Sequence, residues 1–173
     1  MVDIARHQKV NRAIHLLEAG LRSPVVVIDT ALSETAVRDL ARQVNNNRRA
    51  SSGPLPSPAY IASTRVALIE ASLWAMIYLR ISGENILYEV DMDGLLESSR
   101  IYRSLRTTLP ERREEPIDIN HLWVLARALR SDEAWLRRCN RCNVQHLIFP
   151  VPLTPSGCPL CSYKETHRSA SKK

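Results

Sequence analysis

Apolar residues recur three or four positions apart along most of the first 130 residues, which is the spacing of one face of an α-helix. The first such face comprises Ile4, Val10, Ile14, Leu17 and Leu21. Gly20 lies near its end, where a residue at positive φ closes a helix at low cost. Glycines are few, and Gly94 lies just before another helical run. The pattern therefore predicts a mainly α fold built as a helical bundle.

Residues 23–45 predict two short helices joined by a tight turn. Residues 25–28 have the propensity of a strand, but we interpret them as a short helix because Ser33 caps a second helix that runs to about Asn45. The turn falls at residues 31–32, which makes the segment a helix-turn-helix candidate. A plain helical hairpin inside a bundle is the alternative. The apolar side chains available to pack the two helices together are Val26, Val27, Leu32, Val37 and Leu40.

A linker rich in Asn, Ser and Pro at residues 45–58 precedes a predicted long helix. Ser57 and Pro58 are typical of a helix start, and apolar residues from 61 to 79 cover most of the circumference of the helix that follows. Such a helix is buried on most sides, either at the centre of the core or against a partner subunit. Two more helices are expected, at about residues 94–107 and after Asp118.

The stretch from residue 84 to residue 97 contains acidic residues and no basic ones. It would repel phosphate, so we expect it to face away from any nucleic acid, as a solvated face of the protein. The acidic residues are Glu84, Glu89, Asp91, Asp93 and Glu97.

All four cysteines lie in the last 35 residues, as two Cys-x-x-Cys pairs separated by fifteen residues. This spacing is typical of a structural zinc site, in which four thiolates complete a tetrahedral shell. Residues 135–138 and 145–151 have the propensity of strands around the first pair, so we expect a C-terminal zinc ribbon with four cysteine ligands. The predicted ligands of one structural Zn²⁺ are Cys139, Cys142, Cys158 and Cys161.

Disulfide bonds and a redox Cys-x-x-Cys motif are the competing interpretations of the cysteines. The first residues lack the apolar core and cleavage site of a secretory signal, so we expect a cytoplasmic protein whose thiols stay reduced. A redox motif usually opens a helix after a strand, whereas Cys142 precedes a predicted strand. His146 and His167 are close enough in sequence to be spare ligands, but four thiolates already fill the shell.

Composition, charge and known motifs bear on whether the chain binds nucleic acid, associates with a membrane or is an enzyme. The chain is 45% apolar and carries a net charge of +6 (24 basic minus 18 acidic residues). This charge favours an acidic partner such as nucleic acid, but a merely basic soluble protein is the alternative, and so modest an excess does not separate the two. The longest apolar run, residues 71–79, is too short to cross a bilayer, so no membrane association is expected. We find no phosphate-binding glycine loop and no nucleophile elbow, and His7, His15 and His121 lack an obvious nucleophile. The sequence therefore does not predict an enzyme.

Several motifs in order give the chain a resemblance to a known family. They are the segment 29–40 (DTALSETAVRDL), Gly53–Pro56, the long apolar helix, the segments 101–105 (IYRSL) and 122–127 (LWVLAR), and the two cysteine pairs. From about residue 13 to residue 161 the chain resembles the flagellar transcriptional activator FlhC, a bacterial regulator. Asn143 departs from the glycine more usual after the first pair, and the tail after Cys161 is short.

The resemblance implies a mainly helical protein whose four cysteines carry zinc. It also implies a hetero-oligomer with a second helical protein, FlhD, and binding to double-stranded promoter DNA that recruits RNA polymerase to flagellar operons. We expect three regions: a helical domain at 1–133, a zinc-ribbon-like module at 134–165 and a basic tail at 166–173. The alternative is a zinc-ribbon adaptor that binds another protein and makes no direct contact with DNA.

Basic residues near the ribbon and near the second short helix are the candidates to neutralise DNA phosphates. The candidates are Arg38, Arg42, Arg48, Arg49, Arg137, Arg138, Arg141, Lys164 and Arg168.

Overall fold

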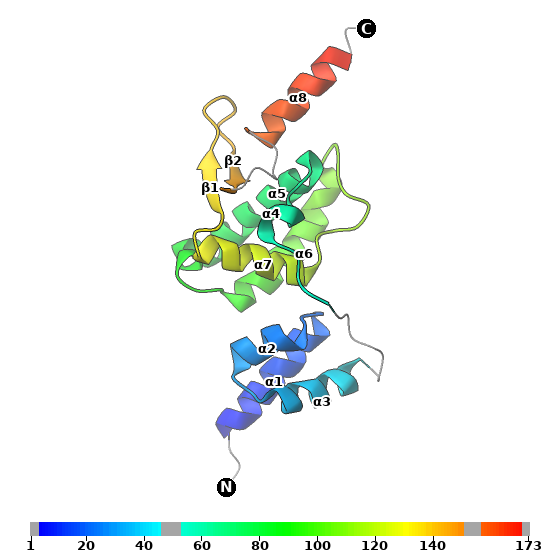
Figure 1. The fold of residues 1–173 in the computed structure, drawn as a ribbon, viewed down its shortest axis with the longest axis vertical. Helices are drawn as coiled ribbons and strands as arrows, with labels where there is room; N and C mark the ends of the chain where they lie inside the picture. Colours follow the sequence, from blue (N-terminus) through cyan, green and yellow to red (C-terminus); the bar gives the residue numbers. More distant parts are fainter. Residues whose placement is uncertain (1–3, 46–52, 151–156, 171–173) are drawn as a thin grey trace. The chain divides into compact units, whose positions relative to one another are not determined.

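The computed structural model describes residues 4–45, 53–150 and 157–170, with the side chains of 167–170 left out. It divides into two compact units, residues 1–54 and 55–173, and each is considered by itself (Figure 1). The described residues are mostly helical and include one two-stranded sheet. The expected mainly α fold, with a small sheet and four close cysteines near the C-terminus, is confirmed. The expected division at residues 133 and 165 stays a prediction, and Arg48 and Arg49 lie outside the described residues.

The first unit consists of α1 (Ile4–Glu18), α2 (Ser23–Thr30) and α3 (Glu34–Val44), which all pack on one another. The predicted face of α1 is buried only toward the end of the helix, where Leu17 lies in the core with Ala13 and Leu16, whereas Ile4 is 69% exposed. Val26 and Val37 lie in the interior as expected, and Val27, Leu32 and Leu40 are half-buried at its edge.

The turn between α2 and α3 explains why residues 25–28 are helical despite their strand propensity. Ala31 adopts a left-handed conformation (φ 54°) and its N–H bonds to the carbonyl of Val27, which closes α2. The hydroxyl of Ser33 then accepts a 3.3 Å hydrogen bond from the N–H of Ala36 and caps α3. The structure thus has the expected helix, tight turn and capped helix packed on α1, an arrangement that fits both a helix-turn-helix-like segment and a plain helical hairpin.

The second unit comprises α4 (Pro58–Ile61), α5 (Arg65–Ser82), the 3-10 helix η1 (Gly83–Leu87), α6 (Met92–Leu105), the 3-10 helix η2 (Arg106–Thr108), α7 (Ile119–Arg130), β1 (Trp135–Arg138), β2 (Gln145–Ile148) and α8 (Pro159–Ala170). Helix α5 is central, because α4, α6, α7, α8 and both strands pack against it. Trp74 and Tyr78 of α5 are fully buried and stack with ring centroids 5.1 Å apart.

The sequence predicted a single long helix starting after Ser57, and this prediction was wrong. The structure has two helices there, α4 and α5, with a helix break between them. Ser57 caps only the four residues of α4, and Thr64 caps α5 with a 3.1 Å hydrogen bond from the N–H of Ala67. Thr64 lies between Ile61 and the apolar residues of α5, so hydrophobic spacing alone did not separate the two helices.

Among the described residues, Arg65–Leu87 is one helical segment long and apolar enough to cross a membrane, with a mean hydropathy of 1.3. The run at residues 71–79 is therefore part of a longer apolar segment. Half of its apolar window is buried inside the protein, and the core helix of a soluble protein has the same properties. The segment is weak evidence for a membrane span.

A buried carboxylate holds α5, α6 and the loop after η2 together. Glu70 is 0% exposed, and its carboxylate accepts hydrogen bonds from the Arg106 guanidinium (3.1 Å), the Tyr102 hydroxyl and the Arg113 N–H (2.6 Å). An isolated charge buried this deeply would be strongly unfavourable, so the arginine and the other two donors are what make the position tolerable.

Helix α6 begins two residues before the position that the sequence suggested. The carboxylate of Asp91 caps it by accepting hydrogen bonds from the N–H groups of Asp93 (3.1 Å) and Gly94 (3.0 Å). A Cβ atom on Gly94 would lie 2.4 Å from that carboxylate and 2.0 Å from the hydroxyl of Ser82. The glycine therefore belongs to the first turn of α6 because the cap leaves no room for a side chain.

Candidate metal centre

The first cysteine pair lies at the tip of the β1–β2 hairpin. The strands pair antiparallel with Arg137 opposite His146, and Cys139 follows β1 directly. The N–H of Cys139 bonds to the carbonyl of Val144, and the N–H of Asn143 bonds to the carbonyl of Cys139, each at 2.9 Å. Asn143 takes the left-handed conformation (φ 61°), which asparagine tolerates better than most residues and which explains its use in place of glycine.

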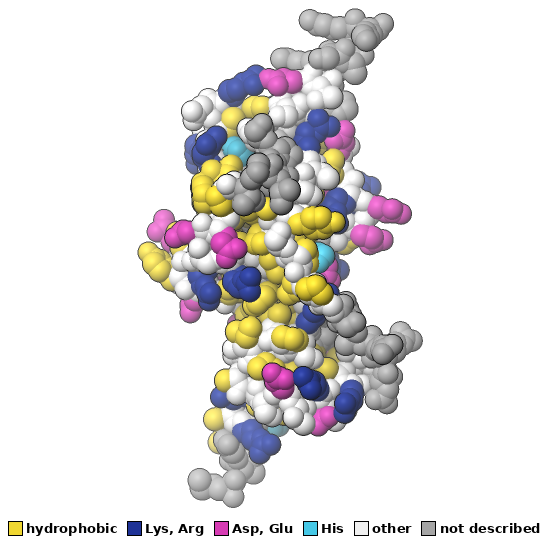
Figure 2. Space-filling view, in the orientation of Figure 1, with side chains coloured by type: hydrophobic (Ala, Val, Ile, Leu, Met, Phe, Trp, Pro, Cys, Tyr) yellow, Lys and Arg dark blue, Asp and Glu magenta, His cyan; other side chains and the backbone are white. Residues whose placement is uncertain are grey.

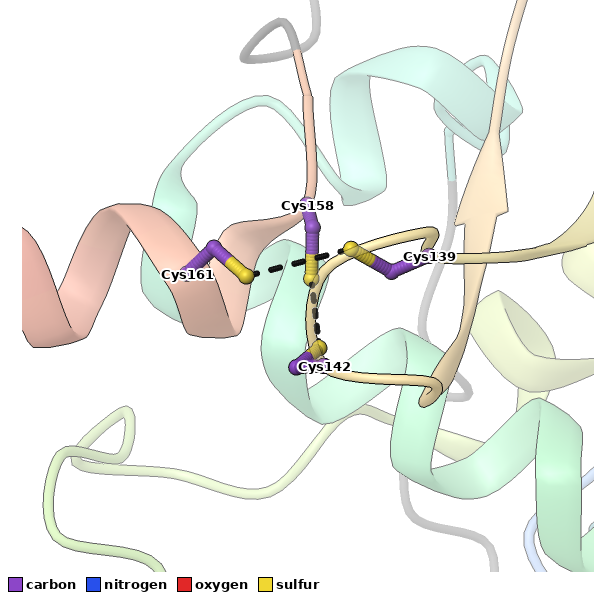
Figure 3. A group of neighbouring side chains, drawn as sticks. All are labelled: Cys139, Cys142, Cys158 and Cys161. Carbon is purple, nitrogen blue, oxygen red and sulfur yellow. Dashed lines mark hydrogen bonds between the residues drawn. The ribbon is translucent and has the colours of Figure 1, made fainter.

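The second cysteine pair opens α8. Cys158 immediately precedes the helix and Cys161 lies in its first turn, where the N–H of Ser162 bonds to the carbonyl of Cys158 at 3.1 Å. From the sequence we expected a second knuckle here and did not anticipate the helix. A Cys-x-x-Cys spacing at a helix start directs both thiols to one side, as Figure 3 shows for Cys158 and Cys161.

The four thiols converge on one point (Figure 3). All four Sγ atoms lie within 4.8 Å of one another; the Cys139–Cys161 distance is 3.8 Å and the Cys142–Cys158 distance is 3.6 Å. Zinc–sulfur bonds of about 2.3 Å in a tetrahedron place the sulfurs about 3.8 Å apart. A disulfide requires about 2.05 Å, and all four cysteines are free. The four side chains therefore fit a tetrahedral metal ion.

Ionisation of the thiols also favours a cation at this point. Backbone N–H groups of Cys142 and Arg141 lower the pKa of Cys139 to about 6. Burial and the neighbouring thiols raise the pKa of Cys161 to about 12, and burial raises the pKa of Cys158. Without a metal, the first thiolate that forms thus opposes ionisation of the others, whereas a divalent cation would stabilise all four.

The two histidines near the cysteines, His146 and His167, were considered as spare metal ligands, and the structure describes the side chain of only the first. His146 is buried on β2, is not part of the group of converging thiols, and neither of its ring nitrogens has a hydrogen-bond partner among the described residues. Burial lowers its pKa. The side chain of His167 is outside the described residues.

The basic candidates fall into two groups, one in each unit. Arg38 and Arg42 are exposed on α3, where they pair with Glu34 (2.9 Å) and Asp39 (3.0 Å). Arg137 and Arg138 are exposed on β1, Lys164 is exposed on α8, and Arg141 pairs with Glu165 at 2.6 Å. Arg168 lies on α8, but its side chain is not described. In Figure 2, lysine and arginine side chains are interspersed with acidic ones on the visible face of each unit.

The structure brings two further basic residues to the helix-turn-helix-like segment. Arg6 and Lys9 of α1 line a groove of about 330 Å³ together with Leu32, Ser33 and Ala36 at the start of α3. The start of a helix favours an anion, and two cations beside it strengthen that preference. Sequence reasoning missed both residues because they lie more than twenty positions before α3, and only the packing of α1 brings them there.

Comparison with known proteins decides the family. A family model described as the flagellar transcriptional activator FlhC matches residues 3–173. The chain belongs to the FlhC family. No curated protein matches it. As a family of transcriptional activators, FlhC proteins do not form a class of enzymes. The four converging cysteines thus belong to a transcriptional regulator, in which a closed metal shell would have a structural role.

Proposed function

We propose that this chain is the DNA-binding subunit of a hetero-oligomeric activator of the FlhD–FlhC type, which binds double-stranded promoter DNA of flagellar operons and recruits RNA polymerase in the cytoplasm. The observation that carries the proposal is the convergence of four thiols within 4.8 Å in a chain of the flagellar activator family. The thiols would hold one structural Zn²⁺ and fix the hairpin tip against the start of α8.

The zinc assignment has a direct test. Cys158→Ser should reduce zinc, measured by elemental analysis, from one ion per chain to near zero and should lower the thermal unfolding midpoint. Ser162→Ala, four residues further along α8, is the matched control and should keep its zinc. A zinc-free Cys158→Ser protein with an unchanged midpoint would reject a structural role for the metal.

The proposed DNA-binding role rests on exposed arginines and lysines in both units. Arg137 and Lys164 are the strongest candidates in the second unit, because the described ion pairs include neither of them. In the first unit, Arg38 and Arg42 lie on α3 of the helix-turn-helix-like segment, and Arg6 and Lys9 of α1 lie beside the start of α3. Contacts of these residues with phosphate would position the protein on DNA and make its affinity fall with salt.

A titration of DNA binding against salt tests this role. Arg137→Ala with Arg138→Ala should weaken binding to all duplexes alike and reduce the slope of log affinity against log salt by about two, one for each lost phosphate contact. Arg100→Ala with Arg103→Ala on α6, near the acidic stretch, is the matched control and should leave the slope unchanged. Equal slopes for wild type and the Arg137/Arg138 variant would reject the assignment.

Exposed apolar side chains support a partner subunit. Ile81 at the end of α5, and Leu87 and Tyr88 at η1, are exposed, with Tyr88 at 81%. These three side chains are close in sequence, and exposed apolar side chains are typical of protein interfaces. A helical partner of the FlhD type is the proposal, and mass measurement of the native complex after co-expression would establish its stoichiometry.

The alternative function is an adaptor whose zinc module binds a protein and makes no DNA contact. Acidic residues are interspersed among the basic ones, and carboxylates pair with Arg38, Arg42 and Arg141. Because these carboxylates neutralise part of the basic surface, they favour the adaptor. The purified complex distinguishes the two functions, because an adaptor would bind no duplex even at low salt.

A further inference from the structure

Helix α8 supplies half of the candidate metal ligands, so the contacts that hold α8 in place also determine the geometry of the site. Helix α8 packs against α5. Its N-terminal end carries Cys158 and Cys161, whose thiols must face the first pair at the hairpin tip. Two arginines, from two other parts of the second unit, contact the turn of α8 that follows the cysteines.

Arg65 at the start of α5 makes the first of these contacts. Its Nη1 donates a 3.0 Å hydrogen bond to the hydroxyl of Thr166, and its guanidinium carbon lies 5.8 Å from the ring centroid of Tyr163. Tyr163 and Thr166 are three residues apart and therefore share a face of α8. The other guanidinium nitrogen, Nη2, lies 3.4 Å from the carboxylate of Glu111. Arg65 thus joins α8 to α5 and to the loop after η2.

Arg141 makes the second contact, from inside the first cysteine pair. Its backbone N–H lies 3.4 Å from the sulfur of Cys139, within hydrogen-bonding distance. Its guanidinium pairs with Glu165 of α8 at 2.6 Å. One residue therefore contacts a ligand of the first pair through its backbone and the helix of the second pair through its side chain.

We propose that Arg65 and Arg141 are positioning residues of the metal centre, which hold α8 so that Cys158 and Cys161 face Cys139 and Cys142 before the ion binds. The proposal rests on the metal site proposed above. Arrangement in advance lowers the ordering cost of binding, so these residues should raise metal affinity without coordinating the ion. It also gives Arg141 a role other than phosphate contact.

The two residues should differ in strength. The Arg65 side chain is 31% exposed and combines a hydrogen bond, a ring contact and a carboxylate. Because Arg65 contacts the helix and not a ligand, its loss should lower metal affinity by roughly 10-fold, the low end of the range for residues bonded directly to metal ligands. Arg141 and Glu165 are mostly exposed, and salt screens such a pair. The loss of Arg141 should therefore cost only a few-fold at low salt and close to nothing at high salt.

The test is a titration of the full-length chain, purified with its partner where it requires one, with Co²⁺ followed by visible absorption. Competition against a chromophoric chelator then gives the affinity for Zn²⁺. Arg65→Ala should bind more weakly than wild type but keep the same tetrahedral cobalt–thiolate bands, since the four ligands are unchanged. Arg65→Lys, which keeps the cation and a donor, should recover part of the affinity. Arg137→Ala is the control, because Arg137 is a hairpin arginine outside both contacts.

A charge exchange tests the second contact. Arg141→Glu should weaken metal binding. Adding Glu165→Arg should restore it, because the reversed residues again form an ion pair between the hairpin tip and α8. If Arg65→Ala fails to fold, Thr166→Val with Tyr163→Leu removes the same contact by changing its partners on α8 and is expected to lower the affinity in the same way. Wild-type affinity in the folded Arg65 or Tyr163/Thr166 variants would overturn the inference, while failure of the wild-type chain to bind either ion would instead overturn the proposed zinc site.

Discussion

The N–H of Leu147 in β2 donates a 3.0 Å hydrogen bond to the hydroxyl of Ser72 in α5. Both residues are buried, and 75 residues separate them in the sequence. The bond attaches the hairpin that carries the first cysteine pair to the central helix of the second unit.

Ser72→Ala should therefore destabilise the protein although serine and alanine differ by one atom. The variant leaves a buried N–H without a partner, which costs about 1–3 kcal/mol of unfolding free energy. Chemical denaturation of the zinc-bound protein measures this loss. Ser104→Ala, at an exposed position of α6, is the control and should change little; equal effects of the two substitutions would contradict the role of this bond.

The buried carboxylate of Glu70 gives a second prediction. Glu70→Gln removes the charge that faces Arg106 and should lower the unfolding free energy by about 3–5 kcal/mol, because the buried guanidinium loses its counter-ion. Glu97→Gln removes a carboxylate paired with Arg100 on the surface of α6 and should leave the denaturation midpoint unchanged. A Glu70→Gln protein as stable as Glu97→Gln would show that the buried pair contributes nothing.

Gly94 in the first turn of α6 gives a third prediction that opposes helix propensity. Alanine is favoured over glycine in a helix by about 1 kcal/mol, yet a Cβ atom here would collide with the Asp91 cap and the Ser82 hydroxyl. Gly94→Ala should therefore lower stability by about 1–3 kcal/mol, the usual cost of overpacking. A thermal unfolding midpoint above that of wild type would mean that propensity, and not the cap, governs this turn.

The buried imidazole of His146 gives a prediction for pH. Burial lowers its pKa below the ordinary value of 6.5, so the unfolded chain takes up a proton at a pH where the folded chain does not. Protonation of the unfolded chain then favours unfolding. The free energy of unfolding is therefore highest above pH 6.5 with respect to His146, and it decreases as the pH falls from 6.5 toward the lower pKa of the folded state.

His146→Gln cannot take up this proton, so it should lose less unfolding free energy than wild type between pH 7.5 and pH 5.5. Both proteins share the same cysteines, and the difference between them therefore isolates the imidazole from protonation of the thiols. His7→Gln, at an exposed position of α1, should follow the wild-type curve. Parallel curves for wild type and His146→Gln would contradict the effect of burial.

Features carried by short-range chemistry could be predicted from the sequence. Ser33 and Asp118 were recognisable as caps, and both cap helices as expected. The cysteine spacing predicted four converging thiols because two tight Cys-x-x-Cys turns leave few other ways to use them. The helical character of residues 25–28 followed from the capped helix after the turn, although local propensity favoured a strand.

Features that depend on distant contacts could not be predicted. Thr64 looked like one more residue of an apolar helix, and only its cap shows that α5 starts there. Glu70 sits in an apolar run, and nothing within that run identifies Arg106 and Tyr102 as its partners. Arg65 and Arg141 contact α8 across 101 and 24 residues of sequence, so their relation to the metal centre is visible only in three dimensions.

The central claim is that four cysteines bind one zinc ion and that this ion holds the subunit in the conformation that binds DNA. Its most direct test is an electrophoretic titration of a flagellar promoter fragment with the co-purified complex, before and after removal of zinc by a chelator, with zinc measured in the same samples. We predict one zinc ion per chain, loss of the shifted band when the ion is removed, and its return when Zn²⁺ is added back. Unchanged DNA affinity in a complex shown to contain no zinc would contradict the claim.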